Sequence, residues 1–180
     1  MTYAEYVAFD GAADARHEYV NGRVYAMAGG SPEHARLAVA VSGDLRVALR
    51  GKPCVPFSSD LRVRVAATGR ATYPDVTFVC GKLERDTGDA VTNPTVIVEV
   101  LSDSTEGEDR GDKWAHYQRI PSLREYVLVS QKAARVEVFS RDATQPELWH
   151  YRDHGSGARA AIESLGVVLE VDALYENRVE

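Results

Sequence analysis

Cysteine is scarce in this sequence: Cys54 and Cys80 are the only two among 180 residues, and they do not form a C-x-x-C pair. This scarcity excludes a disulfide scaffold and a cysteine-rich zinc site, and it fits a reducing cytoplasm. No apolar run approaches the ~20 residues that a membrane span needs, and the first five residues, MTYAE, lack the regions of a signal peptide. We therefore expect a cytoplasmic protein with no membrane partner.

An excess of positive charge is also lacking. The 21 Lys and Arg residues face 27 Asp and Glu residues, which gives a formal net charge of −6. This balance excludes a protein that coats nucleic acid through bulk charge, but it does not exclude a nuclease, whose site needs carboxylates. Locally the sign changes: residues 36–70 carry seven basic and two acidic side chains, and residues 81–112 carry three basic and nine acidic ones. The basic segment fits either a solvated mixed surface or a phosphate track, because most of its cations are Arg, whose planar fork suits phosphate.

The first third of the chain has strong local signals for helices and turns. Thr2 and Glu5 have the spacing of a capping box, which predicts a short helix at the N-terminus. Asn21-Gly22 lies between two β-prone runs and predicts a hairpin, since its turn type needs positive φ at both central residues. Ser31-Pro32 has the form of a helix start, and Gly51 ends the apolar pattern that follows. That pattern recurs every four residues, at Leu37, Val41, Leu45 and Leu49.

The remaining segments alternate between strands and helices. A helix is expected over residues 103–120, ended by Pro121, and a second, short helix is expected near Leu174. This order predicts an α/β fold, a mixed β-sheet with helices packed against it, in one domain over residues 1–180. The predicted strands cover residues 61–65, 73–80, 95–101, 126–129, 136–139, 148–152 and 167–171.

Glu99 is out of place on physical grounds, because it lies in the middle of the most apolar strand of the chain, residues 95–101. A buried carboxylate without a partner is costly, so it must be protonated, paired or bound to a metal ion. A single structural ion pair could explain Glu99 alone. Asp75, which opens another strand directly after Pro74, favours the metal, because two carboxylates on neighbouring strands make an oxygen-rich site for Mg²⁺ or Mn²⁺.

Eight short motifs follow one another in a specific order. They are YAEY at residues 3–6, EYVNG at 18–22, SPEH at 31–34, SDLRV at 59–63, YPDV at 73–76, VEVLS at 98–102, DRGDK at 109–113 and PSLREY at 121–126. The series resembles the Uma-two family, restriction-endonuclease-like proteins of the PD-(D/E)XK nuclease superfamily, from the N-terminus to about Tyr175. The resemblance implies a restriction-endonuclease-like mixed β-sheet flanked by helices, with additional C-terminal strands, and a metal-dependent phosphodiesterase core.

The resemblance also implies roles for individual residues. Asp75 matches the Asp of the family's Pro-Asp motif, and Glu99 matches the acid of the next motif. These two carboxylates and the carbonyl of Val100 are the expected ligands of a Mg²⁺ or Mn²⁺ ion. The superfamily's lysine would stand two residues after Glu99, where this sequence has Leu101. The resemblance therefore points to Lys113, on the following helix, as the catalytic lysine.

Some residues keep two interpretations. Glu18 matches the superfamily's early acid, which would complete the metal shell or hold a second ion, but it could instead pair with Arg23 across the hairpin. Lys113 follows Asp109 by four residues, the spacing of an ordinary helical ion pair. Asp60 is interpreted as a turn or strand-start residue, and His150 and His154 as strand residues, rather than as ligands. His34, in the first turn of a helix, could face the cleft, but a capping or surface role is the preferred interpretation.

The leading hypothesis is a Mg²⁺- or Mn²⁺-dependent endonuclease that acts on DNA, with Glu18, Asp75, Glu99 and Lys113 as catalytic residues. The rival hypothesis is a catalytically inactive module that keeps the nuclease fold for binding or regulation, which Leu101 motivates. RNA or a branched DNA junction is a third hypothesis for the substrate. A homodimer is a further hypothesis, because a chain this small presents a limited cradle to duplex DNA.

Overall fold

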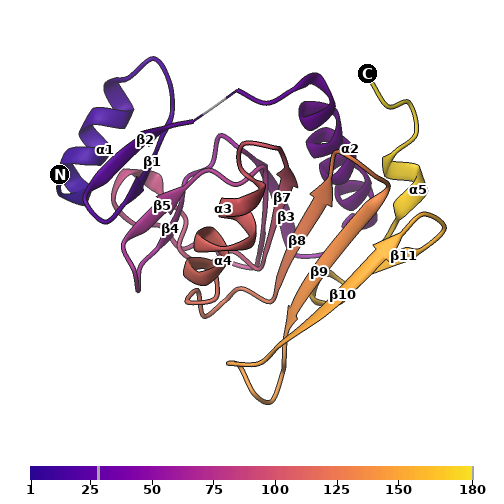
Figure 1. The fold of residues 1–180 in the computed structure, drawn as a ribbon. Helices are drawn as coiled ribbons and strands as arrows, with labels where there is room; N and C mark the ends of the chain where they lie inside the picture. Colours follow the sequence, from indigo (N-terminus) through magenta and orange to yellow (C-terminus); the bar gives the residue numbers. More distant parts are fainter. Residues whose placement is uncertain (28, 180) are drawn as a thin grey trace.

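The N-terminal part of the chain is a helix packed against a hairpin (Figure 1). The computed structural model describes residues 1–27 and 29–179. Helix α1 (Tyr3–Ala12) begins with the predicted capping box, in which the side chains and backbone amides of Thr2 and Glu5 bond reciprocally. β1 (His17–Val20) and β2 (Arg23–Ala26) form the predicted hairpin, with φ values of 49° and 83° at Asn21 and Gly22. Both local signals in the sequence are therefore confirmed.

Two sheets make up most of the fold. β1 and β2 belong to a four-stranded sheet of order β2-β1-β5-β4, the small sheet, which β4 (Val63–Val65) and β5 (Arg70–Thr72) complete. The large sheet has six strands in the order β10-β9-β8-β7-β6-β3. In it β7 and β8 are parallel and the other neighbours antiparallel, so it is a mixed sheet. Its strands are β3 (Cys54–Ser58), β6 (Val76–Cys80), β7 (Val96–Leu101), β8 (Glu125–Ser130), β9 (Arg135–Arg141) and β10 (Trp149–Gly155).

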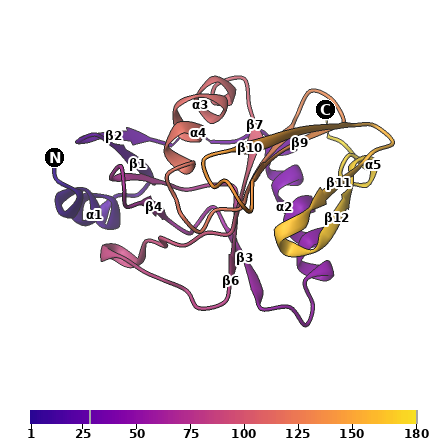
Figure 2. The ribbon, with the colours of Figure 1, turned by 90° about the horizontal axis from the view of Figure 1, so that it is seen from below.

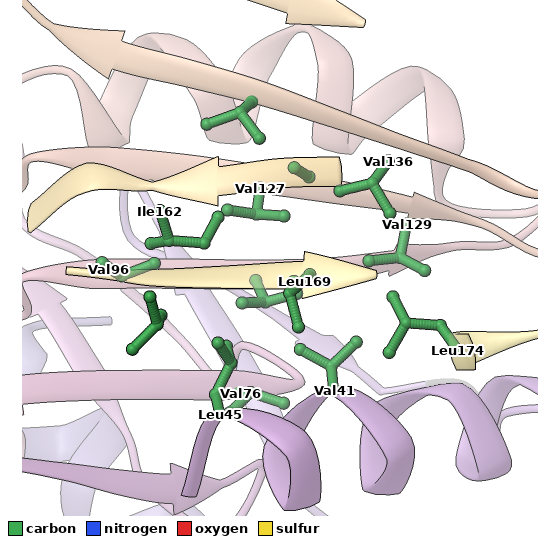
Figure 3. Packing of buried hydrophobic residues seen from close by; sticks show 14 of the residues in the cluster. Val41, Leu45, Val76, Val96, Val127, Val129, Val136, Ile162, Leu169 and Leu174 are labelled. Carbon is green, nitrogen blue, oxygen red and sulfur yellow. The ribbon is translucent and has the colours of Figure 1, made fainter. Parts of the chain in front are cut away.

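Helices and a hairpin cover the two faces of the large sheet (Figure 2). One face packs on α2 (Pro32–Ala48), on α5 (Val171–Leu174) and on the hairpin of β11 (Arg159–Ile162) and β12 (Val167–Glu170). The predicted stripe of α2 points into this core, shown in part in Figure 3. The other face lies under α3 (Glu106–Arg110) and α4 (Asp112–Tyr117). Short 3₁₀ turns, η1 (Thr87–Asp89) and η2 (Glu163–Leu165), complete the elements. The expected mixed α/β fold with extra C-terminal strands is confirmed.

The helix expected over residues 103–120 is wrong as a single element. It is divided into α3 and α4 at Gly111, whose φ of −113° and ψ of −93° leave the helical region. Strands β3 and β5 were not predicted. β3 contains Pro56 and runs along an edge of the large sheet, and β5 has only three residues, so neither carries a clear alternation of apolar and polar residues.

The two cysteines require a second correction. Cys54 and Cys80 are directly opposed in the antiparallel pairing of β3 with β6, and a disulfide joins them. Their separation in sequence conceals this proximity, which depends entirely on strand register. The expectation of a fold without disulfide support is therefore wrong, and the cysteine pattern no longer favours a reducing compartment. Within residues 1–27 and 29–179, no helix is both long and apolar enough to cross a bilayer.

Candidate active site

The pairing of β6 with β7 sets two carboxylates opposite each other. Val76 pairs with Val98 in the antiparallel register, so Asp75, just before β6, faces Glu99. The backbone N–H of Asp75 donates to Glu99 Oε2 (3.3 Å), and the N–H of Val100 donates to Asp75 Oδ2 (2.7 Å). The strand register therefore brings together the two acids that the sequence singled out.

Glu99 is only 3% exposed. Alternation along β7 directs it, with Ile97 and Leu101, to the face beneath α3 and α4. Burial raises the pKa of the Glu99 carboxyl well above its ordinary value and nearby acids raise it further, whereas Lys113 lowers it. The Tyr117 hydroxyl donates to Glu99 Oε1 at 2.9 Å. These surroundings favour the protonated form of the Glu99 carboxyl unless additional positive charge is present.

Lys113 lies among three carboxylates. Its Nζ is 3.0 Å from Asp109 Oδ1, 3.4 Å from Glu99 Oε1 and 3.4 Å from Glu18 Oε1. Burial by itself lowers the pKa of Lys113, but the attraction of the three acids outweighs it and raises that pKa well above its ordinary value. Lys113 is therefore a fixed positive charge at neutral pH. It makes the ion pair with Asp109 that the spacing suggested, although across the break between α3 and α4 and not within one helix, and it also reaches Glu99.

Glu18 enters the site from the small sheet. Its Oε1 contacts Lys113, and its Oε2 is 3.3 Å from Nη2 of Arg70, a residue that is completely buried. Arg70 also pairs with Asp112 at 2.7 Å. Among the described residues Glu18 makes no ion pair with Arg23, so the cross-hairpin alternative is not formed. The carboxylate of Glu18 is instead held by the buried guanidinium group of Arg70.

His34 is nearer to the site than the sequence indicated. Its backbone N–H donates to Ser31 Oγ (3.1 Å), which is the expected capping role. Its side chain, however, places Nε2 3.1 Å from Asp75 Oδ2. The bond to Asp75 raises the pKa of His34, burial opposes this, and the peptide group of Val100 adds a smaller upward contribution. The backbone of His34 thus has the capping role, and its side chain faces the cavity, which is the alternative that the sequence left open.

Four residues of the site escaped the sequence analysis as participants: His34, Arg70, Asp109 and Tyr117. Asp109 carried only a helical spacing signal, and Arg70 stands in a strand of three residues with no pattern around it. Tyr117 occurs between two of the family's motifs but bears no charge, and its hydroxyl also bonds to Thr72 Oγ1 (2.9 Å). Only the tertiary structure brings these side chains to one place.

Residues set aside in the sequence lie elsewhere. Asp60 occupies a turn, where it bonds to Arg16 and to Ser58 Oγ. His150 and His154 are in strand β10, as expected, and His150 Nε2 is 2.9 Å from Asp142 Oδ2. None of the three lines the cavity described next.

Two adjoining hollows open at these residues. A cavity of about 470 Å³ is lined by the acids, Lys113 and His34, with the loop before α2 at its rim. A groove of about 1160 Å³ continues from it between α2 and the loop after α1, and both hollows include His34 and Asp75. Apart from Asp75, the acids of the groove are Asp10, Asp14 and Asp60; Arg62 pairs with the first and Arg16 with the last.

The donor set of the cavity fits a hard divalent cation in its chemistry. The carboxyl groups of Glu18, Glu99 and Asp109 surround a single lysine, and the carboxyl group of Asp75 lines the same cavity. Asp75 Oδ1 makes no hydrogen bond with the described residues. Excess negative charge and oxygen donors are what Mg²⁺ and Mn²⁺ require. Within residues 1–27 and 29–179, no three His, Cys, Asp or Glu side chains form a ready-made metal group. An ion would therefore depend on two carboxylates together with a backbone carbonyl, the set expected from the sequence.

Comparison with known proteins now identifies the family. The Uma2 family model, described as "Putative restriction endonuclease", matches residues 3–172. The chain belongs to the Uma2 family. Two Synechocystis sp. proteins are related to it: "Uncharacterized protein slr1290" is 33% identical over 171 residues (95% of this chain, 89% of the relative), and "Uncharacterized protein sll1609" is 35% identical over 143 residues (78% and 81%).

A solved Uma2-like fold supports the architecture. The crystal structure of "a putative nuclease belonging to DUF820" from Anabaena variabilis superimposes with a TM-score of 0.78, covering 97% of each chain at 14% sequence identity. At this identity the likeness shows the fold alone. This Uma2 protein therefore shares its fold, over nearly its whole length, with the Anabaena variabilis protein.

Proposed function

We propose that this protein is a Mg²⁺- or Mn²⁺-dependent endonuclease that hydrolyses phosphodiester bonds in DNA. The observation that carries the proposal is the strand register that holds Asp75 opposite Glu99 at the wall of an open cavity. The family description, a restriction endonuclease, supports the same class of reaction. The negative charge of the cavity then serves to hold a cation rather than to repel the substrate.

Asp75, Glu99 and the carbonyl of Val100 would hold the ion. When bound, it supplies a water of lowered pKa and offsets the charge of the phosphate. Val100 N–H keeps the Asp75 carboxylate oriented, and the Tyr117 hydroxyl does the same for Glu99. These hydrogen bonds hold both carboxylates in place, and they leave Asp75 Oδ1 available to a cation.

Lys113 acts as a charge rather than as a base in this scheme. Its pKa is raised, so it retains its proton at neutral pH and cannot abstract one from water. An ammonium group beside Glu99 suits the orientation of a water molecule and the stabilisation of negative charge that develops on the phosphate. Glu18 holds Lys113 from the opposite side and is itself anchored by Arg70.

The groove beside the cavity provides a path for the strand that is cut. It opens at Asp75 and His34 and runs along α2, where small side chains leave room for a backbone to approach: Ala35, Ala38, Ser42 and Gly43. Arg46 stands farther along the same wall, exposed and without an ion pair among the described residues. A phosphate bound near Arg46 would belong to the same strand as the phosphate at Asp75.

A binding module without catalysis is the second candidate. Leu101 occupies the position of the superfamily's usual lysine and is buried in an apolar cluster, where it cannot assist a reaction. The lack of a ready-made group of three ligand side chains in the described residues favours the same alternative. Metal titration separates the two: a folded protein with no affinity for Mn²⁺ supports the binding module.

Cleavage of supercoiled plasmid and of defined oligonucleotides tests the proposed function. We expect cleavage that requires Mg²⁺ or Mn²⁺ and that is lost in Asp75→Asn and in Glu99→Gln. Glu163→Gln, which changes an exposed acid of η2 that lines neither hollow, is the matched control and should cleave as the wild type does. Full activity of Asp75→Asn would contradict the assignment. Inclusion of RNA and of a branched junction at the same salt concentration identifies the preferred substrate.

A further inference from the structure

His34 is held in a defined position at the entrance to the cavity. Ser31 caps the first turn of α2 through the His34 amide, which fixes where the side chain leaves the backbone. Gly30 lies directly against the ring: a Cβ atom at position 30 would come within 2.7 Å of Nδ1. The loop before α2 therefore leaves space for the imidazole only because residue 30 has no side chain.

The ring is aimed at the carboxylate that the proposed function requires. Nε2 is 3.1 Å from Asp75 Oδ2, and the same ring lines both the cavity and the groove. For a metal–donor distance of about 2.1 Å, two adjacent ligands of an octahedral ion lie about 3.0 Å apart. The separation of Nε2 from Oδ2 is therefore that of two ligands on one ion.

We propose that His34 Nε2 is a ligand of the divalent cation, beside Asp75 and the carbonyl of Val100, and that it makes the site prefer Mn²⁺ to Mg²⁺. The inference rests on the proposed function, since it concerns the same ion. Imidazole nitrogen is a softer donor than oxygen and suits transition metals, whereas Mg²⁺ takes oxygen donors almost alone. His34 thus converts an all-oxygen site into a mixed one.

A merely supporting role for His34 makes different predictions. If the ring only donated a hydrogen bond to Asp75, the amide of a glutamine at position 34 could replace that bond, and the metal preference would not change. If the ring coordinates the ion, the glutamine offers an oxygen in place of nitrogen. His34→Gln would then lose affinity for Mn²⁺ while keeping most of its affinity for Mg²⁺.

Pulsed electron paramagnetic resonance on the Mn²⁺-loaded full chain tests coordination without any activity assay. We expect electron spin-echo modulation from one directly bound ¹⁴N in the wild type, with MnCl₂ added below one equivalent. The modulation should persist in His150→Gln, which removes an exposed histidine of β10, and disappear in His34→Gln. A wild-type spectrum without this modulation overturns the inference whether or not a variant folds.

Calorimetric titration with MnCl₂ and MgCl₂ supplies the affinities. His34→Gln should bind Mn²⁺ more weakly than the wild type by at least the roughly 10–100-fold that the loss of an outer-shell partner of a metal site costs. Its Mg²⁺ affinity should change by much less. Asp75→Asn should lose both ions. An unchanged ratio of Mn²⁺ to Mg²⁺ affinity in a folded His34→Gln protein overturns the inference.

The outcomes distinguish this inference from the proposed function. Mn²⁺ binding that depends on Asp75 but shows no ¹⁴N modulation overturns the role of His34 and leaves the metal-dependent nuclease intact. A wild-type protein that binds neither ion overturns both. Modulation that survives in His34→Gln assigns the nitrogen to another residue and overturns the inference as well.

Discussion

Glu99 illustrates how an individual residue can serve a site at the expense of the fold. Its carboxyl is buried in the large sheet among other acids, and its pKa is raised well above the ordinary value. A carboxyl whose folded pKa exceeds the unfolded one binds more protons when folded. Folding stability therefore falls as the pH rises from the unfolded pKa toward the folded one.

Glu99→Gln should remove this pH dependence. Without divalent ions, we expect the free energy of unfolding of the wild type to fall relative to that of the variant as the pH rises, because only the wild type carries a buried carboxyl whose ionisation is opposed by burial. Urea denaturation between pH 5 and pH 8 measures the effect. Parallel curves for the two proteins would show that the burial of Glu99 carries no such cost.

Lys113 has the opposite effect on stability, because it neutralises buried acids. Lys113→Met leaves Glu18, Glu99 and Asp109 without their shared cation, and we expect a loss of about 3–5 kcal/mol in the free energy of unfolding. The matched control is Lys132→Met, whose ammonium group is exposed beside Asp103 and should contribute less than about 1 kcal/mol. Equal losses in the two variants would contradict the central place of Lys113.

At the scale of single residues, the sequence was enough to predict the two carboxylates of the site but not the side chains around them. Glu99 was recognisable because a buried acid in an apolar strand needs a partner, and Asp75 because it opens another strand directly after Pro74. For His34 the sequence favoured a capping or surface role, because a histidine in the first turn of a helix needs no further explanation. The direction of its side chain depends on the packing of the loop before α2, which no local pattern encodes.

The break between α3 and α4 determines where Lys113 lies. A continuous helix over residues 103–120 would place Lys113 one regular turn beyond Asp109, whereas the bend at Gly111 starts a new helix with Lys113 in its first turn. A Cβ atom at Gly111 would meet the backbone oxygen of Gly107 at 3.0 Å. This close approach favours a residue without a side chain at the bend.

Gly111→Ala should therefore strain the bend. We expect a loss of about 1–3 kcal/mol in stability, together with weaker metal-dependent cleavage, because relief of the strain moves Lys113. Gly107→Ala is the matched control in α3: its Cβ would meet nothing within 4 Å, so it should be neutral or stabilise by up to about 1 kcal/mol. Thermal melting and the plasmid assay compare them, and a harmless Gly111→Ala would argue against the bend as a positioning device.

Elements were predictable from the sequence where short-range chemistry specifies them. The capping box of α1, the Asn21-Gly22 turn and the Ser31 cap of α2 are each formed by neighbours in the chain. β3 and β5 acquire their structure from partners far away in sequence, and so does the disulfide between β3 and β6. Long-range pairing is therefore the part of the fold that the local pattern leaves undetermined.

The charge of the whole molecule is distributed as its sequence indicated, although only part of the basic segment reaches the groove. Arg62 and Arg16 neutralise acids there, which leaves Arg46 as the cation of α2 that faces the groove without an ion pair among the described residues. Arg50, one turn farther along, does not line it. Arg62 and Arg70 of the segment are buried and fit neither interpretation, and the phosphate interpretation stays a prediction for Arg46.

Arg46→Ala should weaken DNA binding about equally for all sequences and lower the slope of log affinity against log salt by about 1. Arg50→Ala, the matched control, should leave both quantities unchanged. Fluorescence anisotropy with the Asp75→Asn protein measures binding without cleavage. Equal effects of the two substitutions would indicate attraction by overall charge rather than a path along α2.

The two sheets of the molecule are joined at the proposed active site. β5 of the small sheet ends at Thr72 and β6 of the large sheet begins at Val76, so Asp75 lies in the short connection between them. Pro74 stiffens this connection, because its ring fixes φ. The residue that would hold the ion is therefore also part of the covalent link between the two sheets.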